Sequence, residues 1–481
     1  MQVEFNSSLF STWLLYGMKT KIRTEVAALW QLAWPVLIGQ LATVGMSVAD
    51  VAMTGHLSSE DLAAVALGAS LWMIVLVTIM GIMMAINAIV AHEVGAGAFG
   101  RIPHIMRQSM WMAFGIGMIG CGIINFSTLI FDYLQLTPSV NAKASQFVHV
   151  ISIGMPAFSM YRALYSYTTS LNQTKPIMVI ALCGLVFNVI GNWLLVFGNL
   201  GFPQLGATGC AVATGIGLWL MLAGMLWWVR RAPAYQKTYP FSHREAPKWS
   251  EIRSMLRIGL PIGVAYFAEV SAFCAVGLLV ARFGVVSVSA NQIALNFSSL
   301  VFMIPLSLGV ALTTRVGQAM GEGDPVRARF IAWVGIGVSL GFAVLSAIFI
   351  AMSRHSIAAA YTSDLAVQEL TATILLFAAI FQLSDATQVT ASCALRGYKV
   401  TRTPMLIHLL AFYGFALPLG FVLGLAPEWL PWHPQKPMGA SGFWIGLVLG
   451  LTIAAILLVA FLHRLSTRKI RFAASSGKIA G

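Results

Sequence analysis

The sequence predicts an all-α integral membrane protein with twelve transmembrane helices, arranged as two six-helix lobes that form a parallel repeat. Three observations predict this fold class: the composition, the spacing of long uncharged stretches, and an internal repeat. Hydrophobic residues make up 58% of the chain and charged residues only 9%, whereas about 25% of the residues in an ordinary soluble domain are charged. The chain is therefore expected to lie within a lipid bilayer.

The excess of basic residues does not indicate nucleic acid as a partner. The formal net charge is +13, but Lys and Arg stand in short breaks between apolar stretches rather than in one patch. Such positions are typical of loops that face the cytoplasm and anionic lipid headgroups.

The first half of the chain begins with a segment, residues 1–24, that we expect to be cytoplasmic or interfacial. Residues 9–18 are mostly apolar and are followed by basic residues, which predicts a short interfacial helix. The N-lobe, residues 25–230, then holds six spans. Stretches with little or no charge predict them at residues 26–53, 62–91, 108–131, 144–174 and 176–229, the last holding two spans with a turn at 198–203.

A polar, proline-containing stretch, residues 231–252, is expected to be a cytoplasmic linker between the lobes. The C-lobe, residues 253–464, follows it, and residues 465–481 form a cytoplasmic tail. Uncharged or nearly uncharged stretches predict the remaining six spans at residues 258–281, 286–314, 330–353, 370–395, 404–426 and 439–462.

Basic residues are distributed unevenly between the two membrane faces. With twelve spans, one face holds both termini and most of the Lys and Arg. The basic residues of the other face are Lys143, Arg282, Arg354 and Lys436. The positive-inside rule therefore places both termini in the cytoplasm.

The two halves resemble each other in sequence. Trp34-Pro35 recurs as Leu260-Pro261, and Val94-Gly95-Ala96-Gly97 recurs as Met320-Gly321-Glu322-Gly323. Because six spans is an even number, both halves enter the membrane in the same direction. Parallel repeats of this kind usually place a substrate between the lobes. A pore or a structural protein could also be duplicated, but we favour a transporter.

Two acids that interrupt apolar stretches of the second half are the main candidate site. Arg257 precedes Glu269, and Arg396 follows Asp385, by about three helical turns. If both arginines mark one membrane face, each acid lies roughly 16–18 Å from it, near the middle of a hydrocarbon core about 30 Å thick. A charge there costs at least ~2.5 kcal/mol. We predict that Glu269 and Asp385 bind a proton or a small cation.

A structural role is the alternative for these acids, as neutral groups hydrogen-bonded to a neighbouring helix. Gln382 and Gln388 each lie three residues from Asp385, so they share its helical face and form a polar stripe in the middle of a span. We favour a functional role because ionisable groups within spans are rare and usually functional. Gln382, Gln388 and Gln292 are secondary candidates.

Asp50 and two asparagines form a second candidate site, in the outer half of the N-lobe. Asn188 and Asn192 are four residues apart and share a helical face. All three residues are predicted to lie at one level, where they could form a network that accepts a proton or contacts a substrate. Asp50 could instead be an ordinary residue at the membrane boundary.

Two further residues within spans remain open to interpretation. Phe302 is predicted at about the depth of the two C-lobe acids, where its ring could make a cation–π contact, although a packed core aromatic is the more common role. Arg162 is the basic residue inside a span. It could extend toward the membrane surface or pair with a buried acid, and the sequence does not choose between these.

Motifs of several other functional classes are missing from the sequence. It contains neither the phosphate-binding loop G-x-x-x-x-G-K-[ST] nor the zinc motif H-E-x-x-H. We therefore expect no ATP-driven step, no bound cofactor and no enzymatic activity.

Three blocks of sequence resemble one transporter family. Residues 35–55 with 61–68 resemble the first span and following loop of the multidrug and toxic compound extrusion (MATE) transporters. Residues 261–273 are similar to span seven of their NorM branch, and residues 394–401 to the loop after span ten. The resemblance extends from about residue 25 to residue 465, so the N-terminal segment is a departure that the family does not explain.

The resemblance implies a V-shaped pair of lobes and efflux of organic, mostly cationic and apolar compounds, coupled to Na⁺ or H⁺. It maps the family's C-lobe cation site onto Glu269 and Asp385, which would bind Na⁺ in a sodium-coupled member, with Phe302 as the cation–π ring. The N-lobe acid maps onto Asp50, with Asn188 and Asn192 beside it. It also implies a multi-pass protein of the bacterial inner membrane, which we expect to be a monomer.

The main alternative function is that of a flippase for lipid-linked precursors, because a related superfamily shares the architecture. A flippase would need a large cationic cavity for a diphosphate. In this sequence the spans contain acids while the basic residues stand mainly in loops, which suits cationic cargo better.

Overall fold

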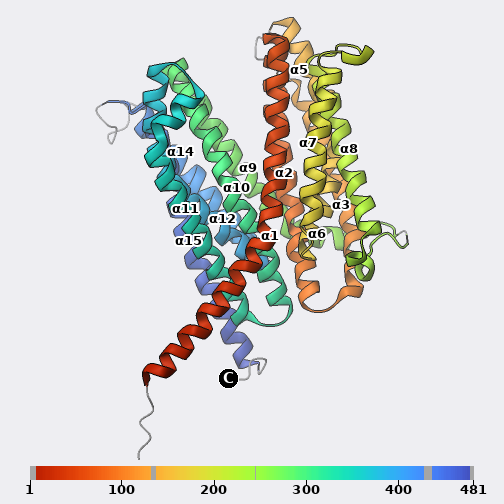
Figure 1. The fold of residues 1–481 in the computed structure, drawn as a ribbon, viewed down its shortest axis with the longest axis vertical. Coiled ribbons are helices and arrows are strands. Elements are labelled where there is room, and N and C mark those ends of the chain that lie inside the picture. Colours follow the sequence, from red (N-terminus) through yellow and green to blue (C-terminus); the bar gives the residue numbers. More distant parts are fainter. Residues whose placement is uncertain (1–6, 130, 132–136, 244, 427–435, 477–481) are drawn as a thin grey trace, which may run out of the picture.

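The computed structural model describes the backbone of residues 7–129, 131, 137–243, 245–426 and 436–476, and side-chain surroundings from residue 20 onward. Within this part of the chain, the secondary structure is helical and forms two bundles (Figure 1). The ends of the predicted N-terminal segment and C-terminal tail, residues 1–6 and 477–481, lie outside the described residues.

The N-lobe forms one bundle, drawn in red to yellow-green in Figure 1. Its helices are α1 (Ser7–Leu57), α2 (Ser59–Gly95), α3 (Ile102–Ser127), α5 (Pro138–Ser152), α6 (Met155–Ser170), α7 (Lys175–Leu195) and α8 (Ala207–Arg231).

The C-lobe forms the other bundle, drawn in green to blue. Its helices are α9 (Trp249–Val280), α10 (Val285–Gly321), α11 (Pro325–Tyr361), α12 (Leu365–Gly397), α13 (Arg402–Leu409), α14 (Leu417–Leu425) and α15 (Ala440–Ser475). A π-helical segment, η5 (Leu410–Ala416), joins α13 to α14 just before Pro418, so these three elements form one irregular span.

The span count agrees with the predicted fold class. Eleven helices of the described chain are long and apolar enough to cross a membrane, and α5 with α6 makes a twelfth if this pair is one span bent by 44°. Pro156, at the start of α6, explains the break, because proline cannot donate the backbone hydrogen bond that would continue α5. The predicted all-α membrane fold is thus confirmed.

The N-terminal helix differs from the expectation. A short interfacial helix was predicted before residue 19, but α1 runs without a break from Ser7 to Leu57. Residues near its middle contact the other lobe: Leu29, Leu32 and Ala33 belong to an apolar cluster whose other members lie in the C-lobe, and Trp30 stacks on Phe342 at 5.7 Å. The helix therefore belongs to both lobes.

The lobes meet where α2 packs against α9 and α10, at the end of the molecule that carries the described ends of the chain (Figure 1). Glycine permits this contact. A Cβ on Gly95 would lie 2.0 Å from the carbonyl oxygen of Gln318, and one on Gly321 would lie 2.1 Å from that of His92. The two glycines occupy equivalent positions in the repeat, so the duplicated sequence produces a nearly symmetric crossing of two backbones.

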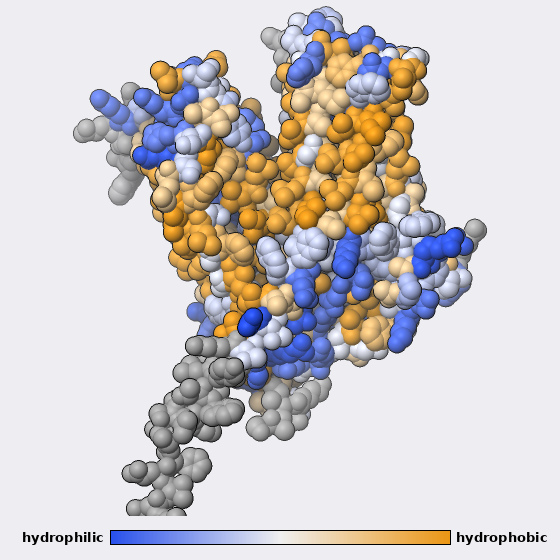
Figure 2. Space-filling view, in the orientation of Figure 1, coloured by the Kyte–Doolittle hydropathy of each residue, from blue (hydrophilic) through white to orange (hydrophobic). Residues whose placement is uncertain are grey.

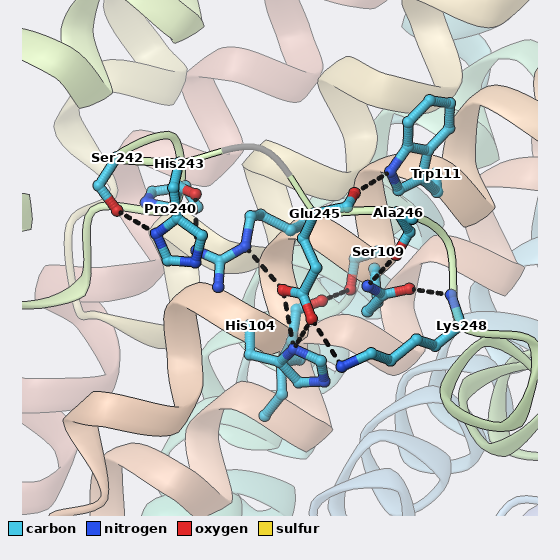
Figure 3. A network of polar contacts seen from close by, with 12 residues as sticks. His104, Ser109, Trp111, Pro240, Ser242, His243, Glu245, Ala246 and Lys248 are labelled. Carbon is cyan, nitrogen blue, oxygen red and sulfur yellow. Dashed lines mark hydrogen bonds and ion pairs between the residues drawn. The ribbon is translucent and has the colours of Figure 1, made fainter.

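The linker between the lobes is fastened to the N-lobe. The Glu245 carboxylate lies 2.8–2.9 Å from the nitrogens of His104, Arg107 and Lys248 (Figure 3). The indole of Trp111 donates to the Glu245 carbonyl at 2.9 Å. These cations hold the pKa of Glu245 well below its usual range, at about 2. The linker therefore docks on α3 through charged hydrogen bonds.

The surface matches a membrane setting. Figure 2 shows a broad hydrophobic band between two hydrophilic ends, and a cleft that separates the lobes at the end opposite their crossing. Hydrophobic residues dominate the walls of the cleft visible in this view. The two lobes thus enclose a V-shaped space that is open at one end.

Candidate cation site in the C-lobe and acid network in the N-lobe

The two C-lobe acids lie inside the same lobe on different helices. Glu269 is in the second half of α9, and Asp385 is in the middle of α12, where its side chain is buried. Glu269 and Arg396 line one small space together with Gln388. Asp385 accepts one side-chain hydrogen bond, from the Gln388 amide at 3.1 Å. The structure therefore brings together the predicted residues Glu269, Asp385 and Gln388.

A small space adjoins Glu269 and Gln388, the residue that donates to Asp385. It has a volume of about 10 Å³, and its polar lining residues are Tyr266, Glu269, Gln388, Ser392, Arg396 and His408. A volume of this order holds one water-sized species. The space thus suits a single small ion or a proton-carrying water, and not an organic molecule.

The donor set fits a hard cation or a proton. Carboxylate and amide oxygens are ligands suited to hard cations. Gln388 adds an observation of its own, because its side-chain oxygen is buried without a hydrogen-bond partner in the described structure. No group of three His, Cys, Asp or Glu side chains gathers at metal-binding distance among the described residues, so a transition-metal site is not indicated there.

Arg396 belongs to this site, which the sequence reasoning missed. Its position after an uncharged stretch predicts a residue at the membrane face, but its side chain is 7% exposed and turns inward. The guanidinium carbon lies 5.1 Å from the centre of the Tyr266 ring, and Nη1 is 3.4 Å from the Tyr266 hydroxyl. Nη1 also lies 3.4 Å from Sδ of Met84, in the N-lobe. Arg396 therefore connects the acid site to the lobe interface.

His408 is the second residue that the sequence did not reveal. It is buried at the end of α13, and its Nε2 lies 2.9 Å from the Ser392 hydroxyl. Its Nδ1 has no hydrogen-bond partner in the described structure. No sequence signal marked it, because a lone histidine in an apolar span shows neither its direction nor its neighbours.

The other C-lobe candidates lie elsewhere. Gln382 is buried and donates to the Ser298 carbonyl at 3.1 Å, so it links α12 to α10. Gln292 is exposed on α10. Phe302 is half-buried and is not among the residues that line the small space beside Glu269.

The N-lobe candidates form one network. One Asp50 carboxylate oxygen accepts hydrogen bonds from the amides of Asn188 at 2.9 Å and Asn192 at 2.6 Å. The other oxygen accepts from the Thr214 hydroxyl at 3.2 Å. The structure thus joins Asp50, Asn188 and Asn192 and adds Thr214, which no sequence pattern indicated.

Arg162 is buried beside Tyr165, with its guanidinium carbon 4.1 Å from the ring centre. Its Nε has no hydrogen-bond partner in the described structure, and none of the ion pairs found there includes it. The sequence leaves two roles open for Arg162. In the described structure it neither extends to the membrane surface nor pairs with an acid.

Comparison with known proteins now assigns the chain to a family. The MatE family model matches residues 35–194 and 261–422, one segment in each lobe. The chain belongs to the MatE family. Multidrug resistance protein PmpM of Pseudomonas aeruginosa is 42% identical to it over 94% of each chain. A probable multidrug resistance protein NorM of Acinetobacter baylyi is 40% identical over 92% of this chain and 96% of the relative.

A crystal structure of the eukaryotic MATE transporter AtDTX14 has the same fold, with a TM-score of 0.84 at 18% identity over 93% of this chain and 98% of that one. The two MatE segments start at Pro35 and Pro261, which are equivalent positions of the internal repeat. They contain both candidate sites, with Asp50, Asn188 and Asn192 in the first and Glu269 and Asp385 in the second.

Proposed function

We propose that this MATE transporter is a multidrug efflux antiporter that exports organic, mostly cationic and apolar compounds in exchange for Na⁺, H⁺ or both. One observation carries the coupling proposal: Glu269 and Gln388 line one small space, and the Gln388 amide donates to the Asp385 carboxylate at 3.1 Å. Arg396 supplies one positive charge to this lining, so the two carboxylates can still take up one proton or small cation.

The cargo is proposed to bind in the cleft between the lobes. Its hydrophobic walls suit apolar compounds of varied shape. PmpM and the NorM relative carry names that describe multidrug resistance, which supports this class of cargo. The protein is a secondary transporter and not an enzyme.

Alternating access couples the two movements. With the cleft open to the outside, a cation binds at Glu269 and Asp385 and favours release of the drug. After the lobes rock, the cation leaves to the cytoplasm and a new drug enters. Linkage requires that cation and drug each bind the two states with different affinity, and the coupling is reciprocal.

The proposed orientation follows from the distribution of basic residues. Both termini face the cytoplasm of a bacterial cell, in its inner membrane, and the cleft is then open to the outside. We propose that the protein works as a monomer, because each chain contains both lobes and both candidate sites. The Asp50 network is proposed to accept a proton or to contact the cargo.

A direct test uses purified protein in proteoliposomes loaded with a fluorescent cationic dye. A Na⁺ gradient and a pH gradient are imposed separately, and dye movement is followed against each. We expect at least one gradient to drive uptake or release in the wild type and neither to do so in Glu269→Gln. Full gradient-driven movement in Glu269→Gln would refute the role of this acid.

The flippase alternative makes a different demand on the same preparation. A flippase would move a fluorescent lipid diphosphate between leaflets, and it would do so independently of Glu269. Transfer of such a lipid without dye transport would replace our proposal with the alternative one.

A further inference from the structure

A polar cavity lies between the two lobes near their crossing. Its volume is about 590 Å³, within the range of about 300–1,000 Å³ for small-molecule pockets. Four elements from both lobes line it: α1, the turn between α6 and α7, the start of α7, and α10. The lining residues that matter here are Gln31, Trp34, Asn172, Gln173, Lys175 and Arg315. Glu269, Asp385 and Asp50 do not line it, so this cavity is separate from the two sites described above.

Arg315 lines this cavity with a guanidinium group that has one nitrogen without a hydrogen-bond partner in the described structure. Its Nη2 donates to the Glu25 carboxylate at 2.5 Å. Its Nε is buried and has no hydrogen-bond partner in the described structure. A buried donor without an acceptor is uncommon and unfavourable. The guanidinium group can therefore donate one more hydrogen bond, to a negatively charged partner.

Lys175 contributes a second positive charge from the other lobe. It is exposed and stands at the start of α7, whose N-cap residue, Thr174, makes no side-chain capping bond. The start of a helix carries free N–H groups and a partial positive charge. The residues that line the cavity include no acid. Glu25 pairs with Arg315, so no acid of the lining compensates the charge of Lys175.

The cavity joins elements that belong to different lobes. Asn172, in the turn before α7, exchanges hydrogen bonds with Gln318 of α10 at 3.2 and 3.5 Å. Lys175 and Arg315 therefore line one cavity only while the lobes are closed at this end. An anion that contacts both residues would link the two lobes.

We propose that this cavity binds the phosphate of an anionic phospholipid headgroup. Lys175 starts one span and Arg315 follows the uncharged stretch of another, on the face that holds most of the basic residues. That is the level at which phospholipid phosphates lie. Lys175, Arg315 and the amides of Gln31 and Gln173 supply donors for the phosphate, and Trp34 lies beside them as aromatic residues do at a membrane interface.

The bound headgroup would bridge the two lobes and hold this end closed. Binding itself does not depend on the proposed function. Only the consequence for transport, a larger fraction of molecules with the opposite end open, rests on that function.

The test measures lipid binding by full-length protein in detergent. Native mass spectrometry and thermal unfolding are followed with added phosphatidylglycerol or phosphatidylcholine, and with soluble glycerol 3-phosphate as a separate arm. We expect wild type to retain phosphatidylglycerol preferentially and to gain thermal stability from it. Lys175→Gln should weaken this binding about fivefold, the equivalent of one basic residue's attraction to an acidic lipid.

Matched variants keep the result interpretable. Arg315→Lys retains a cation for Glu25 but loses the free Nε, and it should also weaken binding. Arg230→Gln removes an exposed basic residue on the same face that does not line the cavity, and it should bind as wild type does. Glu269→Gln should bind lipid normally, which separates this proposal from the transport mechanism.

Equal retention of phosphatidylglycerol by wild type and Lys175→Gln would overturn the proposal, as would equal retention of phosphatidylcholine by wild type. Protection by glycerol 3-phosphate equal to that by phosphatidylglycerol would assign the cavity to soluble phosphate esters and overturn the lipid assignment.

Discussion

The acid of the N-lobe and the acids of the C-lobe have opposite surroundings, although the two lobes derive from one repeat. Asp50 is a single carboxylate that accepts hydrogen bonds from two amides and a hydroxyl. Glu269 and Asp385 are two carboxylates in one lobe, and the one side-chain donor that the structure gives Asp385 is Gln388. Neutral donors stabilise the first charge without any ion, whereas the two C-lobe acids share one cationic neighbour, Arg396, and can take up one further positive charge.

This difference indicates how a duplicated fold divides its tasks. Equivalent positions keep the backbone framework, as Gly95 and Gly321 show at the crossing. The acids do not occupy equivalent positions, so the ion chemistry was not copied with the framework. We infer that the cation drives the cycle from the C-lobe, while the N-lobe network adjusts the cargo side.

Neutralising the C-lobe acids should have the largest effect. We expect Glu269→Gln and Asp385→Asn each to lower gradient-driven dye transport by about 5- to 150-fold, the usual range for a coupling free energy of ~1–3 kcal/mol. Transport is measured in proteoliposomes, with dye binding in detergent as the control for folding. Wild-type rates in both variants would remove the distinction between the lobes.

Two substitutions of Asp50 sharpen the comparison. Asp50→Leu leaves the amides of Asn188 and Asn192 without an acceptor, so we expect a loss of about 1–3 kcal/mol of stability per buried donor. Asp50→Asn keeps an oxygen for both amides and a donor for Thr214, so its stability should stay near that of wild type. Thermal unfolding in detergent measures both.

A matched result for the two Asp50 variants would contradict the geometry, because the carboxylate oxygens would then not be the acceptors that hold the network. In transport, Asp50→Asn should lose less activity than Asp385→Asn does. The reverse order would move the coupling site to the N-lobe.

Removing the donor of Asp385 should have a moderate effect. Gln388→Met keeps the side-chain volume but removes the hydrogen bond from the Gln388 amide to the Asp385 carboxylate. A hydrogen bond to a charged group contributes about 1.5–3 kcal/mol, so the carboxylate should hold a proton more readily in the variant. We expect the pH dependence of dye transport to shift toward higher pH, and an unchanged pH profile would argue against this contact.

The comparison extends to a third acid, Glu245, which lies outside the membrane. Its substitution should have the smallest effect. Cationic partners lower the pKa of Glu245 from 4.5 to about 2. A carboxyl whose folded pKa is depressed stabilises docking of the linker above pH ~4.5 and loses that contribution as the pH falls toward 2. Near neutral pH, where drug transport is measured, the acid is fully charged in either state.

Limited proteolysis of the linker measures this docking. We expect Glu245→Gln to increase cleavage between Pro233 and Pro247 at neutral pH, because His104, Arg107 and Lys248 lose their common partner. The wild-type linker should become equally sensitive only in strong acid. Equal cleavage of both proteins at neutral pH would show that other contacts hold the linker.

The sequence predicted the framework well, because hydrophobic length and charge breaks determine spans directly. It also indicated Asp50 with Asn188 and Asn192, since helical spacing and depth can be counted. It did not predict that Arg396 turns inward, because its partners Tyr266 and Met84 lie on other helices. His408 and Thr214 were missed for the same reason: small or single polar residues gain a role only through tertiary contacts.

The continuous α1 shows a second limit. Residues before Lys19 are apolar on average, which fits an interfacial helix as well as the start of a longer one. Whether such a segment continues into the span depends on what it packs against. In this structure the turns that follow this segment contact the C-lobe, through Leu29 and Trp30, and that contact is not encoded in local spacing.

The crossing at Gly95 and Gly321 also determines which residues the closed end of the protein can tolerate. The two backbones are in direct contact, so a side chain at either glycine would push the lobes apart at this end. A transporter without this contact would lack a closed end while the cleft is open. The absence of a side chain at these two positions thus permits the closed end to form.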